Sequence, residues 1–134
     1  MKLEQLTAGS IMVADVVTVG RHETVRRAAA IMTQHKIHCL VVLPEDPRRA
    51  LGVVTMKDVV QVLCEGDSHV VDRLRVADVL SEPAICVQRD AALLDCLRLM
   101  RNSGVRSAPV LHATTPVGLL SFTDVVRALA TDAS

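Results

Sequence analysis

Two segments of the chain place a hydroxyl and a carboxylate at the same spacing, and this pair could recognise a nucleotide. Gly52 to Asp58 reads GVVTMKD, and Gly118 to Asp124 reads GLLSFTD. If the Thr or Ser begins a helix, the free N–H groups of the first turn and the helix dipole favour a phosphate. The hydroxyl could bind that phosphate, and the Asp could accept hydrogen bonds from both hydroxyls of a ribose.

The same spacing also has a purely structural interpretation. Ser or Thr at the N-cap, followed three residues later by an acidic residue, forms a capping box that stabilises a helix start without any ligand. For either segment alone the capping box is the favoured interpretation. Repetition does not remove it, because a duplicated fold inherits its caps.

The motif belongs to an internal repeat that covers most of the chain. A shift of 68 residues aligns 19–43 with 87–111, and a shift of 66 aligns 51–63 with 117–129. The two extra residues of the first copy fall in the Pro-rich stretch 43–49, where we expect a turn. We expect the repeats to span 8–66 and 67–132.

Each copy predicts the same order of elements, βαββα. Apolar residues at helical spacing predict the first helix of each copy, with Asp90 as N-cap and Gly104 as C-cap in the second. One repeat would leave an apolar sheet face uncovered, so we expect an α/β fold whose repeats pack with pseudo-twofold symmetry as one compact module. The expected strands are 16–19, 39–43 and 52–54, then 85–87, 108–111 and 118–120; the expected helices are 24–35 and 56–64, then one from about 90 and 122–130; segments 6–12 and 70–80 are expected to be partly helical.

The composition argues against several classes of partner. The formal net charge is zero and the aromatic residues amount to one Phe, so we expect no nucleic-acid binding. No apolar stretch approaches the ~20 residues that span a bilayer. The N-terminus lacks the apolar core of a signal peptide. We therefore expect a cytoplasmic protein that does not contact a membrane.

No catalytic or metal-binding arrangement can be recognised either. The chain shows no Ser-His-Asp arrangement, no Gly-rich phosphate loop and no H-E-x-x-H motif, so we expect no enzyme activity. The five His residues have no metal-binding spacing, and we expect no metal. The cysteines, which we expect to be buried thiols because none forms a C-x-x-C pair, are Cys39, Cys64, Cys86 and Cys96.

The order and duplication of these segments resemble a tandem CBS domain pair, also called a Bateman module, from about residue 8 to residue 130. Besides the two motifs, the resemblance is carried by the segments 10–12, 17–19, 24–25, 37–42, 79–80 and 104–110. It implies two clefts between the repeats. The first cleft would use Met12, Val17 and Thr18 near the base, Leu119 as lining, and Arg106, Ser121 and Asp124 for phosphate and ribose. The second would use Leu80, Ile85 and Cys86 near the base, Val53 as lining, and His38, Thr55, Lys57 and Asp58 at the other end.

The resemblance also implies a function. We expect a stand-alone regulatory protein that binds AMP, ADP, ATP or S-adenosylmethionine, has no obligate cofactor, and signals to a separate partner, as in energy sensing. The Asp124 cleft has a modest advantage for phosphorylated ligands, because Arg106 is a permanent cation and His38 is mostly neutral at pH 7. We expect a homodimer formed by apolar helix faces. The alternative is a structural dimerisation module with no physiological ligand.

Overall fold

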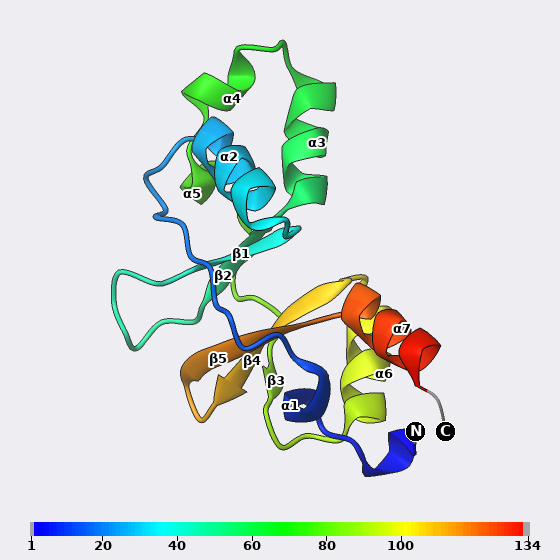
Figure 1. The fold of residues 1–134 in the computed structure, drawn as a ribbon. Helices are drawn as coiled ribbons and strands as arrows, with labels where there is room; N and C mark the ends of the chain where they lie inside the picture. The colour runs from blue at the N-terminus through cyan, green and yellow to red at the C-terminus, as the bar shows by residue number, and fades with distance from the viewer. Residues whose placement is uncertain (1, 133–134) are drawn as a thin grey trace. The chain divides into compact units, whose positions relative to one another are not determined.

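The computed structural model describes residues 2–132, which fall into two compact units (Figure 1). Unit 1 combines Met1–Val16 with Ile85–Ser134, and unit 2 is Val17–Ala84. Each unit therefore takes a short segment from the neighbourhood of the other sequence repeat. The backbone N–H of Val13 donates to Leu119 in unit 1 at 2.9 Å, and that of Ser81 donates to Val53 in unit 2 at 2.9 Å.

Unit 2 contains a two-stranded antiparallel sheet and its helices. The elements are α2 (Val25–His35), β1 (Cys39–Val42), β2 (Gly52–Thr55), α3 (Met56–Glu65), α4 (Val70–Arg73) and α5 (Val76–Val79). Strand β1 lies antiparallel to β2, with Val41 opposite Val53. Where the first strand was expected, at 16–19, the structure has a single parallel bridge between Thr18 and Val41.

Unit 1 repeats this plan with a three-stranded sheet. Its elements are the 3₁₀ helix η1 (Leu3–Gln5), α1 (Ala8–Ile11), β3 (Val87–Gln88), α6 (Leu93–Ser103), β4 (Ser107–His112), β5 (Thr115–Ser121) and α7 (Phe122–Thr131). Strand β4 lies in the middle, parallel to β3 and antiparallel to β5. The α/β class is confirmed, and unit 1 shows the βαββα order; in unit 2 the first strand is present only as the bridge between Thr18 and Val41. The expected helicity within 6–12 and 70–80 is also confirmed, by α1, α4 and α5.

Aliphatic side chains fill the core of each unit, as the near absence of aromatic residues requires. In unit 1 the fully buried residues include Leu93, Met100 and Leu120, and in unit 2 they include Leu40 and Val54. In unit 1 the three-stranded sheet supplies one side of the core and α6 the other. In unit 2 the β1–β2 pair supplies one side and α2 the other. No described helix has the length and apolarity needed to cross a membrane.

The predicted ends of the first long helix in each unit are confirmed only in part. Thr24 caps α2 by accepting a 3.1 Å hydrogen bond from the Arg27 N–H, and Gly104 ends α6 with φ +73°, as expected. Asp90, however, is not the N-cap of α6. That helix begins after Ala92, and its first N–H, on Leu93, donates to the carbonyl of Leu6 at 2.9 Å. A backbone acceptor thus takes the place of a capping side chain.

Candidate functional site

In unit 2 the predicted hydroxyl and carboxylate lie together at the start of α3. Thr55 has extended backbone angles, and its N–H and hydroxyl donate to Oδ2 of Asp58 at 2.8 and 2.9 Å. The N–H of Asp58 donates back to Oγ1 of Thr55 at 3.3 Å. These bonds form a complete capping box, so this pair of residues stabilises the helix start by itself.

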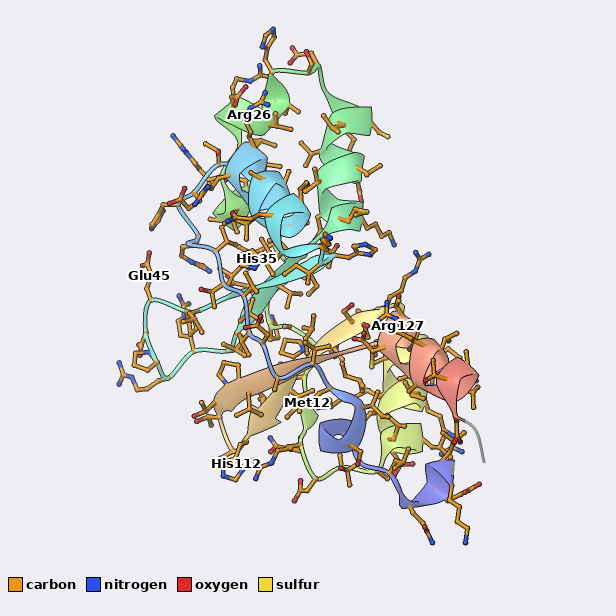
Figure 2. The ribbon with its side chains drawn as sticks, viewed as in Figure 1. Met12, Arg26, His35, Glu45, His112 and Arg127 are labelled. Atoms are coloured by element: carbon orange, nitrogen blue, oxygen red, sulfur yellow. The ribbon has the colours of Figure 1, made fainter. Side chains whose placement is uncertain are left out.

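Unit 1 has the same pair at the start of α7, with a different set of partners. The Ser121 hydroxyl donates to Oδ2 of Asp124 at 2.6 Å, and the Asp124 N–H donates to Oγ of Ser121 at 3.2 Å. The other carboxylate oxygen, Oδ1, accepts a 3.1 Å bond from Nη1 of Arg127. The Asp124 side chain is 19% exposed. Figure 2 shows Arg127 on α7.

The residues predicted to reach a phosphate lie beside these helix starts. The N–H of Met56, the first residue of α3, donates to the His38 carbonyl at 2.8 Å. In the same way the N–H of Phe122 donates to the Arg106 carbonyl at 3.0 Å. The side chains of His38 and Arg106 are both exposed. Each helix start therefore has one adjacent residue whose side chain could bind an anion, an imidazole in unit 2 and a guanidinium in unit 1.

Two glycines allow the predicted base-contacting residues to approach the strands. A Cβ atom on Gly118 would lie 2.6 Å from Sδ of Met12 and 2.8 Å from the Val13 carbonyl oxygen. In unit 2 a Cβ atom on Gly52 would clash with Cδ1 of Leu80. Met12 and Leu80 are half-buried, and each lies next to a residue that pairs with β5 or β2. Because the two glycines have no side chain, Met12 and Leu80 can pack close to the strands that carry the motif.

The remaining predicted residues come from the other unit in each case. Val17 and Thr18 belong to unit 2, where the Val17 carbonyl accepts a 3.0 Å bond from the Val41 N–H. Ile85 and Cys86 belong to unit 1 and are half-buried, and burial raises the pKa of the Cys86 thiol. Their contribution to a shared cleft stays a prediction. Lys57 is exposed on the first turn of α3.

Arg127 is the residue that sequence reasoning missed. Its only signal was the spacing of three residues from Asp124, which places two side chains on the same face of a helix. The aligned position in the first copy is Gln61, whose amide donates to Oε1 of Glu65 at 3.2 Å. Within residues 2–132, no group of three His, Cys, Asp or Glu side chains could hold a metal ion.

Comparison with known proteins shows the family to which this fold belongs. The CBS domain model matches residues 8–65 and 76–131, so the chain belongs to the CBS domain family and contains two such domains. Hypoxic response protein 1 of Mycobacterium tuberculosis is 33% identical over 124 residues, which are 92% of this chain and 85% of that protein. The mitochondrial protein CBSX3 of Arabidopsis thaliana is 32% identical over 80% of this chain, and an uncharacterised protein of Methanopyrus kandleri is 25% identical over 93%. The chain spans 53% and 63% of the lengths of these last two relatives.

Solved structures show the same fold. A hexameric CBS-CP12 protein from bloom-forming cyanobacteria has a TM-score of 0.85 and 30% identity, covering 90% of this chain and 66% of that one. A CBS domain pair solved in complex with 5′-methylthioadenosine and S-adenosyl-L-methionine has a TM-score of 0.80 and 18% identity, covering 93% of this chain and 96% of that one.

Proposed function

We propose that this chain is a regulatory CBS pair that binds an adenosine-type ligand at the starts of α3 and α7 and signals to a separate protein. The candidates are AMP, ADP, ATP and S-adenosylmethionine. The observation that carries this proposal is the hydroxyl–carboxylate pair at both helix starts, where an exposed His38 or Arg106 lies alongside. Support also comes from the CBS pair of similar fold that was solved with two adenosine compounds.

In each site, polar residues bind the ribose and phosphate and apolar residues contact the base. Asp124 accepts hydrogen bonds from the ribose hydroxyls, while Ser121 and Arg106 bind phosphate. In the structure the Ser121 hydroxyl donates to Asp124, so a phosphate must either redirect that hydroxyl or accept its hydrogen bonds from Arg106 and backbone N–H groups. Met12 and Leu119 cover the base, together with Val17 and Thr18. The equivalent set in unit 2 is Asp58, Thr55, His38 and Lys57, with Leu80, Val53, Ile85 and Cys86 at the base.

Binding alone is sufficient for this role, so we propose neither a catalytic step nor an obligate cofactor. We propose a cytoplasmic protein without a membrane partner, and the balanced charge argues against a nucleic-acid partner. Ligand binding can regulate a partner without catalysis. A ligand that binds one conformation of the protein more tightly than another shifts the population toward that conformation.

We also propose that a second copy of the chain covers the exposed apolar face of the helices. Large apolar side chains are exposed at two matching positions of these helices, Val60 and Leu63 on α3 and Val126 and Leu129 on α7. Met56 on α3 is exposed as well. In unit 1 the exposed face of α7 borders a groove whose lining combines apolar side chains with two arginines, namely Leu94, Leu97, Phe122, Val125 and Val126 with Arg98 and Arg101. A similar CBS protein is hexameric. The same face supports the alternative function, a dimerisation module whose motifs act only as helix caps.

A thermal-shift screen distinguishes these two functions. The wild-type chain is heated with AMP, ADP, ATP, S-adenosylmethionine, NAD and cyclic dinucleotides. A ligand at 100 times its dissociation constant should stabilise the fold by ~2.7 kcal/mol. Asp124→Ala, combined with Asp58→Ala, should abolish the shift. Asp78→Ala is the matched control, because Asp78 likewise accepts a 2.8 Å bond at a helix start, from the Arg75 N–H at α5, and belongs to neither motif.

The screen has two informative outcomes. A shift that the double variant loses and Asp78→Ala keeps supports nucleotide binding at the motif. No shift with any adenosine compound would leave the dimerisation module as the function of this chain.

A further inference from the structure

The two sites differ at the carboxylate that is proposed to bind ribose. Both oxygens of Asp124 already accept bonds from protein donors, Oδ2 from Ser121 at 2.6 Å and Oδ1 from Arg127 at 3.1 Å. Asp58 receives its bonds at Oδ2, both of them from Thr55. Among the described residues, none donates a hydrogen bond to Oδ1 of Asp58. Each carboxylate therefore accepts two protein bonds, but at Asp124 they are spread over both oxygens and at Asp58 they fall on one.

The cause is a single difference between the aligned helices. Arg127 lies one turn after Asp124 and is 67% exposed, so its side chain can swing onto the carboxylate. Gln61 holds the equivalent position in α3 and bonds forward to Glu65 instead. A vicinal diol donates two hydrogen bonds to one carboxylate. At Asp58 a diol can donate both bonds to Oδ1, which has no donor among the described residues. At Asp124 it must share each oxygen with a protein donor, and the guanidinium of Arg127 lies against Oδ1.

We propose that Arg127 is a specificity-determining residue, which competes with ribose for Asp124 and makes the Thr55–Asp58 site the first to fill. This inference rests on the proposed function. Arg127 is largely exposed, and an exposed ion pair shifts an equilibrium by about two- to fivefold. We expect the Arg127–Asp124 pair to weaken ribose binding at Asp124 by that factor. The ranking concerns the ribose end alone; Arg106 and His38 act on a phosphate and do not enter it.

Adenosine is the probe that isolates this effect, because it carries the diol and no phosphate. The full chain, labelled with ¹⁵N, is titrated with adenosine while NMR follows the amides of Asp58 and Asp124. We expect the Asp58 amide to reach half-saturation at a lower concentration, by about two- to fivefold. Arg127→Gln should tighten binding at Asp124 by a similar factor, and Gln61→Arg should weaken binding at Asp58. The control Arg73→Gln, which removes a 3.4 Å pair with Asp67, should change neither.

The outcomes separate this inference from the proposed function. If both amides respond but Arg127→Gln leaves the Asp124 site unchanged, Arg127 is not a competitor and the inference is wrong while nucleotide binding stands. Equal or earlier saturation of the Asp124 site in the wild type contradicts it as well. If neither amide responds to adenosine at solubility-limited concentration, the proposed function fails and the inference fails with it.

Discussion

The Thr55 hydroxyl donates a 2.9 Å hydrogen bond to Oδ2 of Asp58 and accepts a 3.3 Å bond from the Asp58 N–H. The same atoms that are proposed to meet a ligand therefore also cap α3. Substitutions at the motif will change both ligand binding and folding, and the two effects have to be measured separately.

Loss of the Asp58 carboxylate should lower the free energy of unfolding in the absence of ligand. Asp58→Ala removes the acceptor of two bonds from Thr55, and we expect a loss of about 1 kcal/mol. Asp58→Asn keeps an acceptor oxygen and should cost less. Urea denaturation measures both. A denaturation midpoint for Asp58→Ala equal to that of the wild type would show that the capping box contributes nothing.

Gly118→Ala should destabilise the chain, because the added Cβ would lie 2.6 Å from Sδ of Met12 and 2.8 Å from the backbone of Val13. Overpacking of this kind costs about 1–3 kcal/mol. Gly20→Ala is the control, since its Cβ would meet Glu23 at an ordinary 3.5 Å. Thermal melting compares the two variants. Similar melting temperatures would mean that Met12 does not approach β5 as closely as described.

The thiols should differ in reactivity. Burial raises the pKa of Cys86 and of Cys96, and the neighbouring Asp95 raises that of Cys96 further. Cys64 was expected to be buried, but it is exposed near the end of α3. Because the thiolate is the reactive form, a disulfide reagent at pH 8 should modify Cys64 well before these two. Mass spectrometry of the modified chain identifies the order. Early modification of Cys96 in the folded chain would contradict its burial.

The raised thiol pKa values also give a direction to the pH dependence of stability. As pH rises above the ordinary cysteine value of ~8.5, the unfolded chain loses its thiol protons first. Below that pH, ionisation of Cys86 and Cys96 does not lower the free energy of unfolding. As pH rises further, toward the pKa values of these thiols in the folded chain, their ionisation in the unfolded chain lowers the free energy of unfolding. Urea denaturation at pH 7 and pH 9.5 should show lower stability at the higher pH, with a smaller difference in Cys96→Ala.

Self-association should depend on the exposed helix residues. We expect a dimer at micromolar concentration by light scattering, and a monomer for Val60→Glu combined with Val126→Glu, because a buried unpaired carboxylate is unfavourable. These side chains are 51% and 63% exposed. Leu43→Glu is the control, since Leu43 is 50% exposed but lies outside the helices. A monomeric wild type would count against the proposed interface.

Local signals in the sequence predicted most of the fold. Apolar periodicity and turn residues act within a few positions, so the βαββα order of unit 1, the start of the first helix near Thr24 and the Gly104 cap were predicted correctly. The exchange of segments between units was not predictable from such signals, because the pairing of Val13 with Leu119 joins residues far apart in the chain. Asp90 failed as a cap because a distant carbonyl, that of Leu6, supplied the acceptor.

In the candidate site, too, some contacts were predictable from the sequence and others were not. The spacing of Thr55 with Asp58 and of Ser121 with Asp124 predicted that each pair would meet, and it does. Arg127 was missed because an exposed arginine on a helix has many partners within reach, and only the folded arrangement selects Asp124.

Titration calorimetry on a double variant tests nucleotide binding most directly. Asp58→Asn with Asp124→Asn keeps an acceptor oxygen at each helix start but removes both negative charges from the proposed ribose sites. S-adenosylmethionine and AMP are titrated into the wild type, the double variant and Asp78→Ala. We expect at least one compound to bind the wild type and Asp78→Ala with equal affinity, and the double variant to lose that binding while it remains folded. Unchanged affinity in the folded double variant, or no binding by the wild type, would contradict the assignment of these two carboxylates.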